Sequence, residues 1–137
     1  MRDDKRGVSM KRLLLMCCIA LSMTAVQSAM AQITAKGGNQ WESFCAQGGL
    51  PPVCFLAALA YDKGEGVRQD KFKAVELYTK ACDGGYSDGC AFLGVKYDKG
   101  EGVKLDKKRA LALYGKACDL KNEQGCKYYA TLKGQGH

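Results

Sequence analysis

Hydrophobic residues recur along the second half of the chain at the three- and four-residue spacing of amphipathic helices. One stretch covers residues 88–100, and its apolar face consists of Cys90, Leu93, Gly94 and Tyr97. The next covers residues 106–119, and its face consists of Ala110, Leu113, Tyr114, Ala117 and Cys118. We expect Asp88 and Asp106 to cap the first turns and Gly100 to end the first helix. The pattern predicts a helix pair in which small residues allow close approach and tyrosines fill the gaps.

The same helix pair is encoded twice. Residues 54–89 align with residues 90–125 without a gap, and 18 of the 36 positions are identical. The longest shared run, "YDKGEGV", stands at 61–67 and again at 97–103. We interpret its glycines as the turn between the helices of a pair, with the valine folding back as an apolar plug. A phosphate-binding loop is the alternative, but the run lacks the Gly-x-Gly-x-x-Gly and Walker spacings.

The flanks continue the repeat imperfectly. Trp41 stands where the repeat has Tyr78, so we expect it in the core rather than stacked on a carbohydrate. Lys133 replaces a repeat tyrosine, as is expected of an atypical end cap. The expected repeat domain spans 40–133 and comprises a half repeat at 40–53, repeats at 54–89 and 90–125, and a capping helix at 126–133, between a lead at 32–39 and a tail at 134–137.

The first 31 residues have the layout of a secretory signal peptide. A basic start at Lys11 and Arg12 precedes a nine-residue apolar run at 13–21, and small residues end at Ala31. The run is too short for a stable membrane span. We expect cleavage between residues 31 and 32, with Met10 as an alternative start. The rival interpretation, a lipoprotein, uses a cysteine within the run, but the bulky methionine before it is unfavourable.

Charge and cysteine content narrow the function classes. The formal charge of the whole chain is +7, but residues 32–137 hold 16 Lys and Arg against 12 Asp and Glu, which leaves +4. This modest charge disfavours a nucleic-acid partner. Six of the eight cysteines remain after residue 31, an even number in a chain bound for an oxidising compartment.

The repeat motif resembles a known family. It reads Leu93-Gly94-x-x-Tyr97-x-x-Gly100-x-Gly102-Val103-x-x-Asp106, followed by Ala110-x-x-x-Tyr114-x-Lys116-Ala117-Cys118. It resembles the Sel-one-like repeat, a relative of the tetratricopeptide repeat, and the added cysteine pairs make the chain similar to the secreted Helicobacter cysteine-rich protein family. The resemblance implies an all-α fold of antiparallel helix-pair repeats that form a short right-handed solenoid stapled by disulfides. Together with the predicted cleavage of the signal peptide, it implies a secreted or periplasmic location.

The phase of the repeat then selects one of the 15 pairings open to six cysteines. We expect three bridges, each joining the end of one helix to the start of the next: Cys45–Cys54, Cys82–Cys90 and Cys118–Cys126. A structural zinc site is the alternative, but the cysteines are too widely spaced and the single histidine, His137, is terminal. We expect no cofactor and no metal.

Resemblance to the cysteine-rich family also implies penicillin binding or β-lactam hydrolysis. The residues carry this activity poorly, because no Ser-x-x-Lys or Lys-Thr-Gly is present after residue 31. The only serines after residue 31 are Ser43 and Ser87. The metal-dependent route has only one histidine available, the terminal His137. The sequence therefore favours a binding module over an enzyme.

Two surfaces are candidates for binding. Leu56, Phe92 and Tyr128 recur at an offset of 36 on the first helix of each pair, edged by Lys63 and Lys99. They predict a groove for a peptide or a glycan, unless they only pack neighbouring repeats together. The second is the basic cluster of Lys107, Lys108 and Arg109 with Lys104. It either contacts peptidoglycan, acidic glycans or phospholipid head groups, or forms the solvated face of an amphipathic helix. The expected protein is monomeric, and its partner is a protein, a peptide or peptidoglycan.

Overall fold

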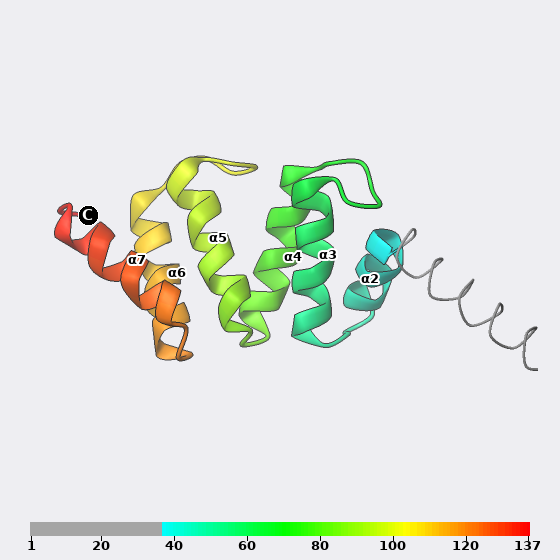
Figure 1. Cartoon of the computed structure of the whole chain (residues 1–137), viewed down its shortest axis with the longest axis horizontal. Coiled ribbons are helices and arrows are strands. Elements are labelled where there is room, and N and C mark those ends of the chain that lie inside the picture. Colours follow the sequence, from blue (N-terminus) through cyan, green and yellow to red (C-terminus); the bar gives the residue numbers. More distant parts are fainter. Residues whose placement is uncertain (1–36) are drawn as a thin grey trace, which may run out of the picture. The chain divides into compact units, whose positions relative to one another are not determined.

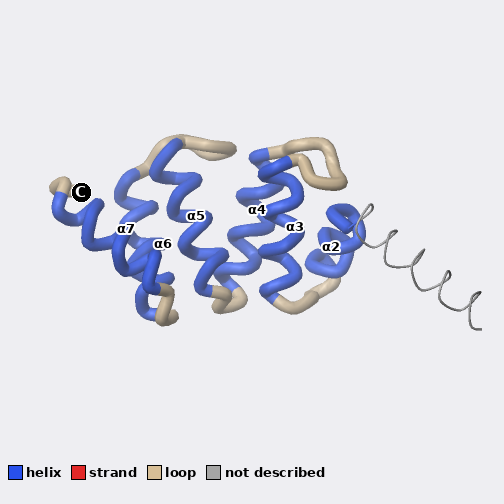
Figure 2. Tube along the Cα trace, viewed as in Figure 1, coloured by secondary structure: helices blue, strands red, loops and turns tan. Residues whose placement is uncertain are grey.

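A computed structural model describes residues 37–137, and this part of the chain consists of helices and loops without strands (Figures 1 and 2). The helices are α2 (Gly37–Ala46), α3 (Pro51–Lys63), α4 (Lys71–Asp83), α5 (Ser87–Lys99), α6 (Lys107–Asp119) and α7 (Glu123–Gly134). The predicted all-α class and helix-pair architecture are confirmed. The predicted signal peptide and most of the lead lie outside the described residues.

Each helix packs against the next one along the chain. In addition, α5 contacts both α3 and α7. The first helices of successive pairs therefore lie side by side and form one face of the repeat unit, which we call the inner face. No described helix combines the length and apolar character needed to cross a membrane.

The helix ends follow from their capping residues. The carboxylates of Asp70 and Asp106 each accept a hydrogen bond at 3.0 Å from a backbone N–H three residues later, as N-caps do. At the other end of the preceding helices, Gly64 and Gly100 adopt the left-handed conformation, with φ of 74° and 69°. Glycine adopts this conformation without steric cost, so both helices stop there.

The predicted N-cap role of Asp88 is wrong. Helix α5 begins at Ser87, and its N-cap is Tyr86, which makes no side-chain capping bond. Asp88 lies within the first turn, where a carboxylate suits the positive end of the helix. Its Oδ1 atom instead accepts a hydrogen bond at 2.5 Å from the side-chain amide of Asn122, which itself caps α7.

The shared "YDKGEGV" run turns the chain between the helices of a pair, as predicted. Its second glycines, Gly66 and Gly102, have φ of 72° and 71°. A Cβ atom on Gly102 would lie 2.4 Å from the carbonyl oxygen of Lys71, so the loop needs glycine for closeness as well as for conformation. Val67 and Val103 pack against the core.

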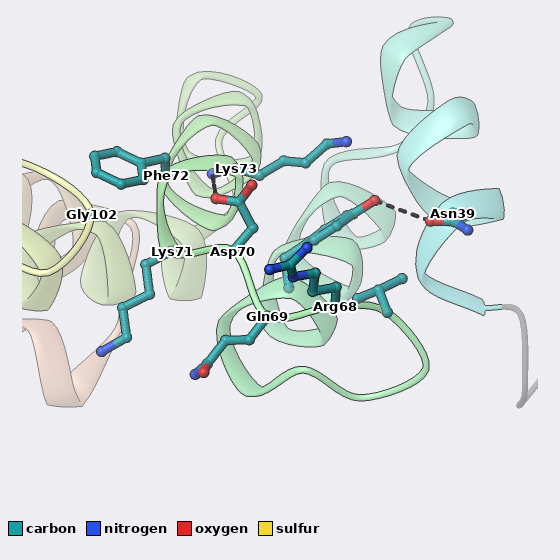
Figure 3. A pocket seen from close by; sticks show the side chains of 10 residues that line it. Asn39, Arg68, Gln69, Asp70, Lys71, Phe72, Lys73 and Gly102 are labelled. Atoms are coloured by element: carbon teal, nitrogen blue, oxygen red, sulfur yellow. Dashed lines mark hydrogen bonds between the residues drawn. The ribbon is translucent and has the colours of Figure 1, made fainter.

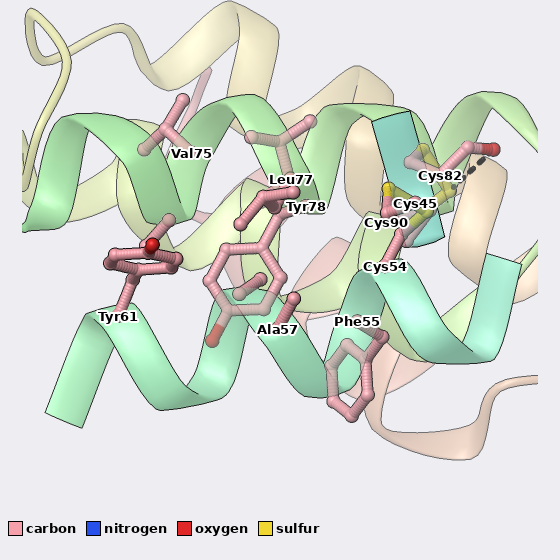
Figure 4. Close-up of a cluster of buried hydrophobic side chains, with 14 of the residues drawn as sticks. Cys45, Cys54, Phe55, Ala57, Tyr61, Val75, Leu77, Tyr78, Cys82 and Cys90 are labelled. Atoms are coloured by element: carbon pink, nitrogen blue, oxygen red, sulfur yellow. Dashed lines mark hydrogen bonds between the residues drawn. A yellow bond between two sulfur atoms is a disulfide. The ribbon is translucent and has the colours of Figure 1, made fainter. Parts of the chain in front are cut away.

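The core consists mainly of alanines, tyrosines and half-cystines (Figure 4). Tyr78 is fully buried between helices that approach each other over alanines. In the second repeat, a Cβ atom on Gly94 would lie 2.7 Å from the ring of Tyr114, so the glycine makes room for the tyrosine. Trp41 packs against the same core, as predicted.

Three disulfides join consecutive helices. They link Cys45 to Cys54, Cys82 to Cys90 and Cys118 to Cys126, and the joined Cα atoms are 5.0, 4.5 and 4.5 Å apart. These are the pairs that the phase of the repeat selects. The central bridge is buried, since Cys82 and Cys90 are 1% and 0% exposed.

Candidate functional site

A cavity of about 310 Å³ opens on the inner face, over α5 and between its neighbours α3 and α7. Three of the four predicted binding residues line it, namely Phe92, Lys99 and Tyr128. The fourth, Leu56, is 43% exposed on α3 but does not line the cavity. The remaining lining residues are Asp62, Asp88, Ala91, Val95, Lys96, Glu101, Asn122 and Gln124.

The two aromatic rings of the site are half buried. Phe92 is 40% exposed and packs on Phe55 and Tyr78, with ring centroids 5.2 and 5.6 Å apart. Tyr128 is 38% exposed and packs on Tyr114 at 5.1 Å. Each ring therefore contacts a core aromatic on one side and remains open to the cavity on the other. The core contacts hold the rings in place, which lowers the entropic cost of using them in binding.

A buried lysine forms one wall of the cavity. Lys96 is 5% exposed, and its Nζ atom lies 2.6 Å from Asp62 Oδ1 and 2.9 Å from Glu101 Oε2. Burial alone would lower the pKa of Lys96, but the hydrogen bonds to the two carboxylates outweigh burial and raise it. The hydrogen bond and charge of Lys96 in turn lower the pKa of Glu101. Lys96 and Glu101 are therefore both ionised at neutral pH.

This network joins the two repeats, because Asp62 belongs to the first repeat and Lys96 and Glu101 to the second. Sequence reasoning missed it. The available signal was a departure from the repeat: Lys96 occupies the position of Ala60, a buried residue. The polar residues Asp88, Asn122 and Gln124 were missed as well, since they follow no shared repeat pattern.

Two larger and more open hollows lie along the loops. The first, of about 880 Å³, is lined by Arg68, Lys71, Phe72 and Lys73 together with Tyr61 and Gly102, among others (Figure 3). The second, of about 700 Å³, is lined at equivalent positions by the predicted basic cluster of Lys104, Lys107, Lys108 and Arg109. The basic cluster therefore has a counterpart in the first repeat.

The wall of the first hollow contains a second ionic contact. The Nζ atom of Lys73 lies 2.6 Å from Glu42, and the hydroxyl of Tyr61 donates to the same carboxylate at 2.5 Å. The hydrogen bond to Glu42 raises the pKa of Lys73. Among the described residues, no group of His, Cys, Asp and Glu is arranged to hold a metal ion.

Comparison with known proteins identifies the repeat. The family model of the Sel1 repeat matches residues 51–86 and 87–122. Each match begins where a first helix begins, three residues before the repeat limits read from the sequence. No curated protein matches.

Solved structures share this arrangement. Cysteine rich protein B of Helicobacter pylori is 32% identical over 66% of this chain and 67% of its own, with a TM-score of 0.61. A Sel1 repeat protein from Oxalobacter formigenes is 25% identical over 83% of this chain, with a TM-score of 0.69. The protective antigen c5321 of uropathogenic Escherichia coli is 26% identical over 72%, with a TM-score of 0.57. The matched regions span 46% and 26% of the last two structures.

Proposed function

Because the chain belongs to the Sel1 repeat family, a family of protein-interaction modules, we propose that it binds an extended peptide segment of a partner protein in the inner-face cavity. The observation that carries this proposal is the pair of half-buried rings, Phe92 and Tyr128, that face one cavity. Aromatic anchors of this kind supply large contact areas at little entropic cost.

The size and polarity of the cavity suit part of a peptide. Its volume of about 310 Å³ lies near the lower end for ligand pockets. It would therefore accept one or two side chains of a peptide that lies across α5. Lys99 and Gln124 are exposed at the cavity and could hydrogen-bond to the peptide backbone.

Binding accounts for the lining better than hydrolysis of a β-lactam does. The described residues around the cavity include no serine, cysteine or histidine. The lining therefore does not form a serine or cysteine nucleophile activated by an adjacent histidine, as common acyl-transfer sites do. The proposal therefore assigns the cavity to recognition.

Selection from a random peptide library on the oxidised chain tests this proposal. We expect the selected peptides to bind the Phe92→Ala and Tyr128→Ala variants at least tenfold more weakly, because truncation of a central anchor costs roughly 2 kcal/mol or more. Phe44→Ala is the matched control, since Phe44 is 54% exposed on α2 and does not line the cavity.

A second pair of variants guards against a folding defect, because Phe92 also contacts the core. Lys99→Glu and Gln124→Lys change exposed side chains at the cavity and should alter peptide affinity without changing the thermal midpoint. Equal affinity of all four cavity variants and the wild type would refute the proposal. Competition by soluble peptidoglycan fragments would instead make the partner a cell-wall polymer.

The proposal includes export before folding. The layout of residues 10–31 and the three disulfides of the described part support it, since disulfides persist in oxidising compartments. Expression of the full chain in a bacterial host should yield a product that begins at Gln32 and contains no free thiol among its six cysteines. Retention of residues 1–31 on a reduced, cytoplasmic product would count against export.

A further inference from the structure

One edge of the repeat unit gathers positive charge. At this edge run the long loops 64–70 and 100–106, and there α4 and α6 begin (Figure 1). We call it the loop edge. The cations that line its two hollows are Arg68, Lys71, Lys73, Lys104, Lys107, Lys108 and Arg109. The only acidic side chains in the two linings are Asp70 and Asp106, whose carboxylates already accept the N-cap hydrogen bonds.

Part of this charge is neutralised by neighbours. Lys71 lies 3.7 Å from Glu101, Lys73 pairs with Glu42, and Lys107 pairs with Asp98. Four cations, Arg68, Lys104, Lys108 and Arg109, are exposed and form no salt bridge within residues 37–137. Of these, Arg109 donates a hydrogen bond to the hydroxyl of Tyr97 at 3.1 Å, and the other three carry the charge that is most available. They leave the loop edge with available positive charge.

Local helix stability does not account for the cations. The first turns of α4 and α6 contain no acidic residue, although the positive end of a helix favours acidic side chains there. Lysines occupy the first turn of both helices, and that of α6 also contains Arg109. Their placement opposes the helix dipole, so a role outside the helix is the better explanation.

Two large apolar side chains stand exposed among the cations. Phe72 is 74% exposed, and Leu105 is 53% exposed. Figure 3 shows the ring of Phe72 extending away from the ribbon of α4 on the side of Gly102, with Lys71 and Lys73 on either side along the chain. Apolar side chains bordered by lysine and arginine are typical of surfaces that lie on an anionic bilayer.

From these observations we propose that the loop edge docks on an anionic lipid surface. Phe72 and Leu105 enter the head-group region, and Arg68, Lys104 and Lys108 face lipid phosphates. A soluble acidic polymer would also attract the cations, but it would leave the exposed phenyl ring of Phe72 without a role. The combination of charge and apolar exposure therefore favours the bilayer.

Tryptophan reporters in the full oxidised chain test this contact at the residue level. Phe72→Trp places a reporter at the loop edge. Phe44→Trp is the matched control, because Phe44 is exposed in the last turn of α2. This turn leads to the start of α3, whereas the loop edge lies at the end of α3. With vesicles of phosphatidylglycerol and brominated phosphatidylcholine, we expect fluorescence quenching in the Phe72→Trp chain and none in the Phe44→Trp chain, after subtraction of the Trp41 signal. Both reporter chains contain residues 1–36, so membrane attachment through that segment would affect them equally. It would not produce a difference in quenching between the two reporters.

Charge variants complete the test. A triple variant in the Phe72→Trp chain replaces three cations by glutamine: Arg68→Gln, Lys104→Gln and Lys108→Gln. It should raise the lipid concentration for half-maximal quenching on the order of 100-fold, because each basic residue near the surface contributes about 1 kcal/mol. Lys80→Gln, Lys121→Gln and Lys127→Gln remove the same charge from exposed positions elsewhere and should leave it nearly unchanged. Added salt should weaken the contact.

Three outcomes would overturn the proposal. These are an unquenched reporter at position 72, equal effects of the two triple variants, and equal quenching on purely zwitterionic vesicles. Binding of a soluble sulfated polysaccharide without quenching by vesicles would reassign the loop edge to acidic glycans.

Discussion

At the scale of single residues, Lys96 is the clearest departure from the repeat. It replaces an alanine, buries its amine, and connects a carboxylate of the first repeat to one of the second. Removing one member of a buried ionic network lowers the free energy of unfolding by more than the whole network contributes to it, because the remaining buried charges lose their partner. The cost is moderated here by the partial exposure of the carboxylates, since Glu101 is 34% exposed.

Lys96→Met should therefore lower the free energy of unfolding by about 2 kcal/mol at neutral pH, less than for a fully buried pair. Methionine keeps the apolar stem, so the loss reports mainly the charge. Urea denaturation of the oxidised chain measures it. Lys99→Met is the control, and its effect should stay within about 0.5 kcal/mol because Lys99 is exposed. Equal stability of both variants would mean that the network contributes little.

The lowered pKa of Glu101 predicts an acid-sensitive contribution. Its unperturbed value is 4.5, and the folded chain holds the pKa below this value. The stabilisation is thus fully present above about pH 4.5 and is lost as the pH falls through the folded pKa. Glu101→Gln should lower stability at pH 7 and shrink the stability difference between pH 7 and pH 3.

Glu65→Gln is the matched control for that measurement. Glu65 occupies the equivalent position of the first repeat, and its ion pair with Lys63, at 3.9 Å, is exposed. Its substitution should change stability little at either pH. If both variants retain the wild-type pH dependence, another carboxylate controls the acid response.

The sequence located the aromatic part of the site and missed its ionic part. Phe92 and Tyr128 share an offset of 36 on equivalent helix faces, and helical periodicity alone brought them to one surface. Lys96 could not be found in this way, because a lysine on a helix normally faces solvent. Its two partners, Asp62 and Glu101, lie in the other repeat and in a loop, which helical periodicity does not reveal. Asp88 misled for a related reason: an acidic residue near a helix start resembles an N-cap, and only tertiary structure showed Asn122 as its partner.

At the scale of elements, glycine determines how closely successive helices approach. Gly89 and Gly125, at equivalent positions of α5 and α7, face Ala81 and Ala117 of the preceding helices. A Cβ atom on Gly89 would lie 2.8 Å from the Cβ of Ala81 and 3.0 Å from the backbone nitrogen of Cys82. The backbone atom cannot move aside as the end of a flexible side chain can.

Gly89→Ala should therefore destabilise the chain by about 1–3 kcal/mol through overpacking, although alanine is intrinsically the better helix former. Gly134→Ala is the control. It lies at the end of α7 with no atom within 4 Å of an added Cβ, so it should be neutral or slightly stabilising. Thermal unfolding of both variants decides the matter, and a stabilised Gly89→Ala would show that α4 and α5 can separate without cost.

Helix ends that depend on local chemistry were more predictable than the start of α5. Asp106 caps α6 and Gly100 ends α5 with a left-handed backbone, as predicted, and Asp70 and Gly64 do the same at the equivalent positions of the first repeat. The start of α5 has no capping side chain, so its local sequence does not mark it, although the nearby Cys82–Cys90 disulfide joins it to α4.

At the scale of the whole molecule, the disulfides compensate for the small number of repeats. A stack of two repeats and two flanking parts has few interfaces over which to bury its apolar faces. The bridges close loops with sequence separations of 9, 8 and 8 residues. In the chain-entropy model a loop of this length contributes about 2.5 kcal/mol, a large share of a total near 5–15 kcal/mol.

The three bridges should nevertheless differ in importance. Replacing Cys82 and Cys90 by alanine removes the entropic term and also leaves a void, because both sulfurs are buried in the main core. Replacing Cys118 and Cys126 removes a similar entropic term at a partly exposed junction. We expect a loss of about 3–4 kcal/mol for the central pair and about 2.5 kcal/mol for the terminal pair. Urea denaturation under non-reducing conditions measures both losses.

The order of these losses separates two accounts of the fold. If each disulfide stabilises the fold through loop entropy alone, the two variants lose equal amounts of unfolding free energy, because the closed loops have equal length. If the central bridge also fills the contact between the repeats, its loss is larger and carries over to the inner face, where Phe92 projects from the helix that Cys90 anchors. Peptide affinity should then fall more in the central variant than in the terminal one. A terminal loss equal to or larger than the central loss would contradict this second account.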